Sequence, residues 1–117
     1  MRTPKIYIAG KITGLDLNEA RKAFADAEAF LREVAPKCAI VNPMTLPHQH
    51  DHSYESYMQE CLEELKQCKV VYVLNGWSGS KGVLTEIRMA AERRMLIIFE
   101  TANADKVVAF ELNKMIR

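Results

Sequence analysis

The sequence predicts an α/β fold in which helices cover both faces of a parallel sheet. Four short apolar runs alternate with segments whose apolar residues recur at helical spacing. One turn containing glycines follows the first run, and another follows the third. Because parallel strands need a long crossover, which is usually a helix, this alternation indicates a parallel sheet with right-handed connections.

The expected elements run along the whole chain without an internal repeat or a linker. Strands are expected at residues 5–9, 38–41, 70–74 and 95–99. Helices are expected at 19–34, at 54–68, from the second glycine turn to about 94, and near the C-terminus. Asp16 or Asn18 can cap the first helix, and Pro36 cannot continue it. We expect a single domain over residues 1–117.

The expected strand order is 2-1-3-4, which makes a small flavodoxin-like three-layer sandwich of about four strands. In that order the topological switch point lies between the first and third strands. The turns at 10–14 and 76–82 then meet at the carboxyl ends of adjacent strands. Ligands of open parallel sheets bind at this place, so the two turns are predicted to form one cleft.

Composition and charge narrow the possible functions. The formal net charge is +1, so no basic excess indicates a nucleic acid polymer or an anionic membrane as partner. The apolar runs are too short to cross a bilayer, and the first residues lack the long apolar core of a signal peptide. The three cysteines, Cys38, Cys61 and Cys68, lack the spacing of a disulfide framework or a zinc site. We expect a cytoplasmic protein that uses no cofactor.

Both glycine turns carry residues that suit a phosphate. The first contains Lys11 and Thr13, and the second contains Ser78, Ser80 and Lys81 just before a helix. Hydroxyls, an ammonium group and free backbone N–H groups at a helix start favour an anion. The turns match neither a P-loop nor a G-x-G-x-x-G fingerprint. A glycine turn that holds no ligand is an equally good interpretation of the spacing alone.

Glu86 is the strongest candidate for chemistry. We expect it in the first turn of the helix, where a glutamate often does no more than complement the helix dipole. Partly desolvated at a strand-end cleft, it could instead be a nucleophile or general base on a sugar carbon. Tyr7 lies in the first strand, while Tyr54 and Tyr57 are best explained as core aromatics. Trp77 either covers the core or stacks on a flat ligand ring.

A histidine-rich loop and an acidic helix face offer weaker candidates. His48, His50 and His52 alternate, so they could share one side of an extended loop and bind zinc or nickel. Such loops are more often plain surface, and we assign no metal site. The glutamates of the next helix form a solvated face, although Glu60 lies near the end that approaches the cleft.

Three stretches of the chain carry a family resemblance. They are KIYIAGKITG at the start, VNP after the second strand, and LNGWSGSKGVLTE around the second glycine turn. Together they resemble the nucleoside 2-deoxyribosyltransferase-like family, and most of all its small phage and bacterial members. The 2′-deoxynucleoside 5′-monophosphate N-glycosidases are related to the same family. The resemblance extends to about residue 99.

The resemblance implies an enzyme that cleaves or exchanges the N-glycosidic bond of a nucleoside or its 5′-monophosphate. By that resemblance Glu86 is the nucleophile on the anomeric carbon, Tyr7 orients its carboxylate, and Asn42 and Trp77 flank the base. The residues implied for substrate and phosphate binding are Gly10, Lys11, Ile12, Thr13, Gly14, Ser78, Ser80 and Gly82. A homodimer or larger homo-oligomer is implied as well.

The chain departs from the family at its second carboxylate. The positions of the family's two aspartates, eight residues apart before the central strand, hold Cys61 and Lys69. Glu60 is adjacent, but one residue along a helix turns a side chain by about 100°. Glu60 is therefore a possible second acid only if the helix is rotated. A catalytically weak module that binds or senses a nucleotide is the alternative function, and a metal-dependent enzyme using the histidine loop is a third.

Overall fold

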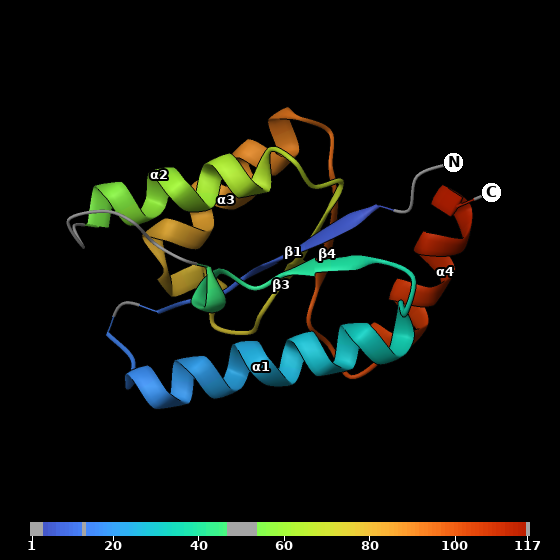
Figure 1. Ribbon diagram of the computed structural model, residues 1–117, viewed down its shortest axis with the longest axis horizontal. Helices are drawn as coiled ribbons and strands as arrows, with labels where there is room; N and C mark the ends of the chain where they lie inside the picture. Colours follow the sequence, from blue (N-terminus) through green and yellow to red (C-terminus); the bar gives the residue numbers. More distant parts are fainter. Residues whose placement is uncertain (1–3, 13, 47–53, 117) are drawn as a thin grey trace.

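The structure, a computed structural model, describes residues 4–12, 14–46 and 54–116 (Figure 1). Its strands are β1 (Lys5–Ala9), β2 (Ala39–Val41), β3 (Val70–Val73) and β4 (Leu96–Phe99). Its α-helices are α1 (Leu17–Val34), α2 (Tyr54–Leu65), α3 (Lys81–Glu92) and α4 (Ala104–Ile116). Two short 3₁₀ helices, η1 (Pro43–Thr45) and η2 (Trp77–Gly79), precede α2 and α3 respectively.

The four strands form one parallel sheet in the order β2-β1-β3-β4, which confirms the predicted order. Strand β1 lies inside the sheet, where Tyr7 is in register with Val41 on one side and Val71 on the other. The side chains of β3 are buried along its whole length. Such apolar strands are typical of a parallel sheet that is covered on both faces.

Each face of the sheet has its own apolar core, as expected of a flavodoxin-like sandwich. Side chains alternate along β1, so Ile6 and Ile8 point to one face and Tyr7 to the other. The first core contains Phe24 and Leu31 of α1 and Val108 and Leu112 of α4. The second contains Cys61 and Leu65 of α2 and Val83 and Ala90 of α3. Figure 1 shows α1 on one side of the sheet and α2 and α3 on the other.

Several element boundaries differ from the sequence prediction. Helix α2 ends at Leu65 rather than at residue 68. Of the two predicted caps of α1, the structure uses Asp16, which accepts from the N–H of Glu19. Helix α3 begins at Lys81, directly after a 3₁₀ turn that periodicity does not reveal. Glu86 therefore lies in the second turn of α3, and the prediction of the first turn was wrong. The reason is that the Ser80 hydroxyl caps the helix by accepting from the N–H of Val83.

The apolar residues of α4 are only partly buried. Val108 and Leu112 are buried, whereas Val107 is exposed. Neighbouring residues of a helix point about 100° apart, so Val107 and Val108 do not share one face. Among the described residues, no helix combines the length and the apolar character that crossing a membrane requires.

Gly10 follows β1 at a point where the backbone is tightly packed. A Cβ atom there would lie 2.8 Å from Leu74 Cδ1 and 2.9 Å from Phe24 Cζ, and both of those side chains are buried. Gly10 thus lets the chain pass over the core directly before it enters the cleft.

We predict that Gly10→Ala lowers the free energy of unfolding by about 1–3 kcal/mol, because overpacking displaces the buried rings and methyls. The matched control is Gly79→Ala, whose Cβ atom would meet only Lys11 Nζ at an ordinary 3.6 Å. We expect the control to change stability by less than about 0.5 kcal/mol. Urea unfolding followed by circular dichroism measures both, and equal losses would contradict the packing argument.

Candidate active site

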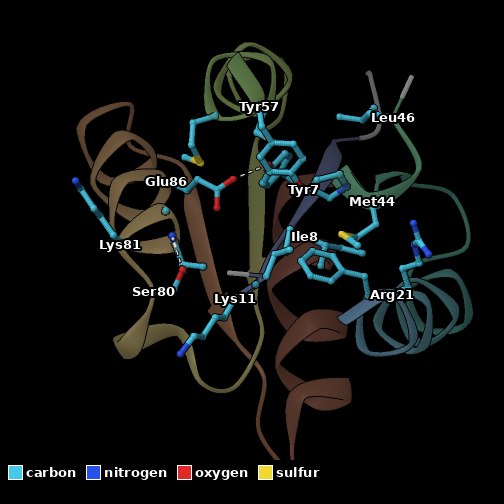
Figure 2. A pocket seen from close by; sticks show the side chains of 18 of the residues that line it. Tyr7, Ile8, Lys11, Arg21, Met44, Leu46, Tyr57, Ser80, Lys81 and Glu86 are labelled. Carbon is cyan, nitrogen blue, oxygen red and sulfur yellow. Dashed lines mark hydrogen bonds between the residues drawn. The ribbon is translucent and has the colours of Figure 1, made fainter. Parts of the chain in front are cut away.

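A cavity of about 950 Å³ opens at the carboxyl ends of β1 and β3 (Figure 2). The chain after β1 contributes Gly10, Lys11 and Ile12 to it, and the start of α3 contributes Ser80 and Gly82. The two glycine turns therefore meet in one cleft, as the strand order predicts. The volume lies within the range of small-molecule sites.

Glu86 and Tyr7 form a buried pair in this cavity. The Tyr7 hydroxyl donates to Glu86 Oε2 at 2.5 Å, although the two residues are 79 positions apart. Glu86 is only 6% exposed, and Tyr7 is completely buried. Strand β1 supplies the tyrosine and helix α3 the carboxyl, so the pair bridges the two elements that frame the cleft (Figure 2).

Burial sets the protonation of this pair. Desolvation raises the pKa of the Glu86 carboxyl from 4.5 to about 7, and the hydrogen bond from Tyr7 lowers it in part. Desolvation and the charge of Glu86 hold the pKa of Tyr7 well above its ordinary value. Tyr7 therefore remains a neutral donor, while Glu86 titrates close to neutral pH. A carboxyl of this kind suits nucleophilic or acid–base chemistry.

Cys61 of α2 lies beside the pair and also lines the cavity. Burial raises the pKa of its thiol to about 11, although hydrogen bonding with Tyr7 and Tyr57 acts in the opposite direction. Burial raises the pKa of the Tyr57 hydroxyl too. At neutral pH both groups are thus uncharged, and neither is acidic enough to replace a carboxylic acid.

Cationic and polar groups gather where α3 begins. The Ser80 oxygen accepts from the N–H of Val83 at 3.2 Å, which leaves the hydroxyl proton of Ser80 for another acceptor. Lys11 Nζ lies near Gly79, and Lys11 and Lys81 both line the cavity. The helix N-terminus adds partial positive charge to these cations. This corner can therefore hold an anion such as a phosphate.

Only some of the predicted site residues line the cavity. Among the described residues, the cavity lining includes Tyr7, Gly10, Lys11, Ile12, Ser80, Gly82 and Glu86. Gly14, Asn42, Glu60, Trp77 and Ser78 are not among the described residues that line it. Thr13 and the three histidines of the loop lie outside the described residues. Within the described ranges no group of acids, histidines or cysteines is placed to hold a metal ion.

The residues that do not line the cavity have structural partners instead. The Trp77 ring packs against Phe99 with centroids 5.2 Å apart, so of the two predicted roles the geometry favours covering the core. Asn42 accepts from the N–H of Met44 at 3.0 Å, and its amide donates to Glu28 at 3.0 Å. The base-flanking roles of Asn42 and Trp77 stay predictions.

One wall of the cavity was not predicted from the sequence. Helix α1, η1 and α2 contribute mainly apolar side chains, with a single arginine among them: Leu17, Arg21, Phe24, Pro43, Met44, Leu46, Tyr57 and Met58. Residues 17, 21 and 24 follow helical spacing, so the signal was present in the sequence. Helical spacing alone does not distinguish residues that line a cavity from residues that pack in a core. Tyr57 was expected to be only a core aromatic.

Comparison with protein families decides where the chain belongs. Residues 4–99 match the family described as Domain of unknown function (DUF4406). The chain belongs to this family. No curated protein matches the sequence.

The DUF4406 chain also resembles a solved structure. A 2-deoxyribosyltransferase from the psychrotolerant bacterium Bacillus psychrosaccharolyticus superposes with a TM-score of 0.61 and 20% identity. The match covers 81% of this chain and 70% of the enzyme chain. At this identity the likeness concerns the fold, and in that respect it confirms the resemblance expected from the sequence.

The raised pKa of Glu86 gives a prediction about stability. As pH rises from 4.5 to about 7, the unfolded chain loses the proton of Glu86 while the folded protein keeps it, so stability falls. Glu86→Gln should remove this loss of stability, because glutamine does not titrate. Between about pH 4 and about pH 8 the variant should gain up to about 3 kcal/mol relative to wild type. Urea unfolding across that pH range measures the difference, and Glu33→Gln on the exposed face of α1 is the control. Parallel pH profiles for Glu86→Gln and wild type would contradict the assignment.

Proposed function

We propose that this protein cleaves or exchanges the N-glycosidic bond of a nucleoside or nucleoside 5′-monophosphate. Glu86 is the nucleophile on the anomeric carbon. The observation that carries the proposal is the buried pair of Tyr7 and Glu86, which faces a cavity of small-molecule size. The fold shared with a 2-deoxyribosyltransferase supports the same reaction class.

The geometry of the pair suits a double displacement. Because the Tyr7 hydroxyl holds Glu86 Oε2, the other carboxylate oxygen can attack the anomeric carbon. The bond to the base breaks as the sugar ester forms, and its electron pair leaves with the base. Water then releases the free sugar, or a second base takes the sugar in a transfer reaction. Either route returns Glu86 as a carboxylate.

The cationic corner supports a phosphorylated substrate. Ser80, the first N–H groups of α3 and Lys11 lie together on the side of the cavity next to Glu86. A 5′-phosphate bound there would hold the sugar against the nucleophile and would interact with the helix dipole. The apolar wall of α1 and η1 then takes the base. The homo-oligomer and the cytoplasmic location expected from the sequence stay predictions.

A nucleotide-binding module with weak chemistry is the second candidate, and Cys61 is the observation in its favour. Glycosidases commonly use two carboxyl groups. In this cavity a neutral thiol lies beside Glu86, which carries the one carboxyl group among the described lining residues. Both candidate functions require a nucleoside or nucleotide to bind. Only the first requires the protein to cleave the N-glycosidic bond.

Base release distinguishes them. The protein is incubated with ribo- and deoxyribonucleosides and their 5′-monophosphates, and free base is measured by chromatography. We expect release by wild type and a loss of about 10³-fold or more in Glu86→Ala, because the nucleophile is gone. Glu33→Ala, prepared in the same way, is the control for base release by a contaminating enzyme. Tight nucleotide binding without any release would favour the binding module, and release that persists in Glu86→Ala would remove the nucleophile assignment.

Ser80→Ala tests the phosphate corner. It should raise KM for the 5′-monophosphate by about tenfold, since hydrogen bonds to charged groups contribute about 1.5–3 kcal/mol, and change the nucleoside much less. Loss of the helix cap should also lower stability by about 1 kcal/mol, so assays are run well below the melting temperature. Ser78→Ala, outside the described cavity lining, is the matched control. Equal effects on nucleoside and nucleotide would show that Ser80 does not contact phosphate.

A further inference from the structure

The cavity has one carboxyl group where glycoside chemistry commonly uses two. Of the described residues that line it, only Glu86 carries a carboxyl. Glu60 precedes Cys61 on α2, and its charge acts on the Cys61 thiol, but the described lining does not include it. The position beside the pair is therefore occupied by a thiol. If Glu86 attacks the sugar, the described residues that line the cavity offer no second carboxylic acid to protonate the departing base.

The charges of the cavity indicate which kind of base can leave when no second carboxyl group protonates it. Among the described lining residues there are three cations, Lys11, Arg21 and Lys81, and one carboxyl group, that of Glu86. Arg21 lies on the apolar wall, across the cavity from Ser80 and Lys81 (Figure 2). Neither a hydrogen bond nor an ion pair ties Arg21 to another described residue. A guanidinium on the wall that takes the base favours a base that becomes negative and opposes one that is already positive.

Building on the proposed function, we propose that this pocket acts on N-glycosides of acidic bases, which leave as anions without a proton from a carboxylic acid of the described lining. Oxopyrimidines and oxopurines with several carbonyl groups form this chemical class. Their ring nitrogen bears the negative charge, and their carbonyl oxygens are acceptors for a guanidinium. The apolar side chains of Phe24 and Met44 line the side of the cavity where such a ring would bind.

The reaction balances without an enzymic acid. The free carboxylate oxygen of Glu86 forms a bond to the anomeric carbon while the bond from that carbon to the base nitrogen breaks. The electron pair goes to the base nitrogen, and the base departs as an anion that later takes a proton from water. Water then attacks the sugar ester, its proton passes to solvent, and the Glu86 carboxylate is restored.

A graded series of leaving groups tests the proposal. The substrates are 2′-deoxyuridine 5′-monophosphates with methyl, hydrogen, fluoro or nitro at carbon 5, which differ in the acidity of the base and little in size. Base release is followed under single-turnover conditions, so that product release does not mask chemistry. We expect the rate to rise by about three- to tenfold for each unit by which the pKa of the base falls. A slope near zero would overturn the proposal and leave the proposed function standing.

Cys61→Asp is the informative variant, and Cys61→Ser is its matched control. An aspartic acid beside the pair can protonate the base, so the slope should flatten and the methyl compound should react about 10²-fold faster. Cys61→Ser introduces no acid and should keep the steep slope of wild type. If Cys61→Asp does not fold, the wild-type series alone decides. A steep slope that persists in folded Cys61→Asp would overturn the role given to this position.

Two further outcomes separate the hypotheses. A 5′-monophosphate of N7-methyl-2′-deoxyguanosine carries a cationic base that also leaves without added acid. We expect it to bind at least about tenfold more weakly than the fluoro compound, because the cavity is cationic. Tighter binding of the methylated compound would overturn the preference for acidic bases. Absence of release from every substrate, including the nitro compound, would overturn the proposed glycosidase itself.

Discussion

The hydrogen bond between Tyr7 and Glu86 is the interaction on which the candidate site depends. It connects the inner strand β1 to the helix α3, and it lies where the sheet ends and the cavity begins. Desolvation raises the pKa of the carboxyl, and the tyrosine limits that rise, so the group can change its charge near neutral pH. A carboxyl exposed to water would be fully ionised there and would be a weaker partner for a sugar carbon.

This pair is held in place by packing that has no chemical role of its own. Ser80 caps α3, and Val83 and Ala90, which lie on the same side of the helix as Glu86, are buried. Tyr7 is fixed because β1 has a strand on each side. Burying a carboxyl costs stability at neutral pH, and such costs are typical of functional sites rather than of structural ones.

Cys61 gives the cavity a chemical character that the fold alone does not imply. In the proposed reaction, a neutral thiol would lie beside the nucleophile Glu86, and the described lining would hold no second carboxylic acid. The rate of bond cleavage would then depend on the acidity of the leaving base. The cations at the rim favour negative charge on the ligand, both at the α3 N-terminus and at the wall that carries Arg21. A phosphorylated substrate with an acidic base is consistent with both features.

The sequence by itself determined the four strands, their order and the meeting of the two glycine turns, because apolar periodicity and crossover handedness are local or topological properties. That order was enough to bring Tyr7, Ser80 and Glu86 together. Only the tertiary structure decided that Trp77 packs against Phe99 and that Arg21 lines the cavity. These features depend on how helices rotate and pack against distant segments, and helical spacing is the same whether a residue faces a core or a cavity.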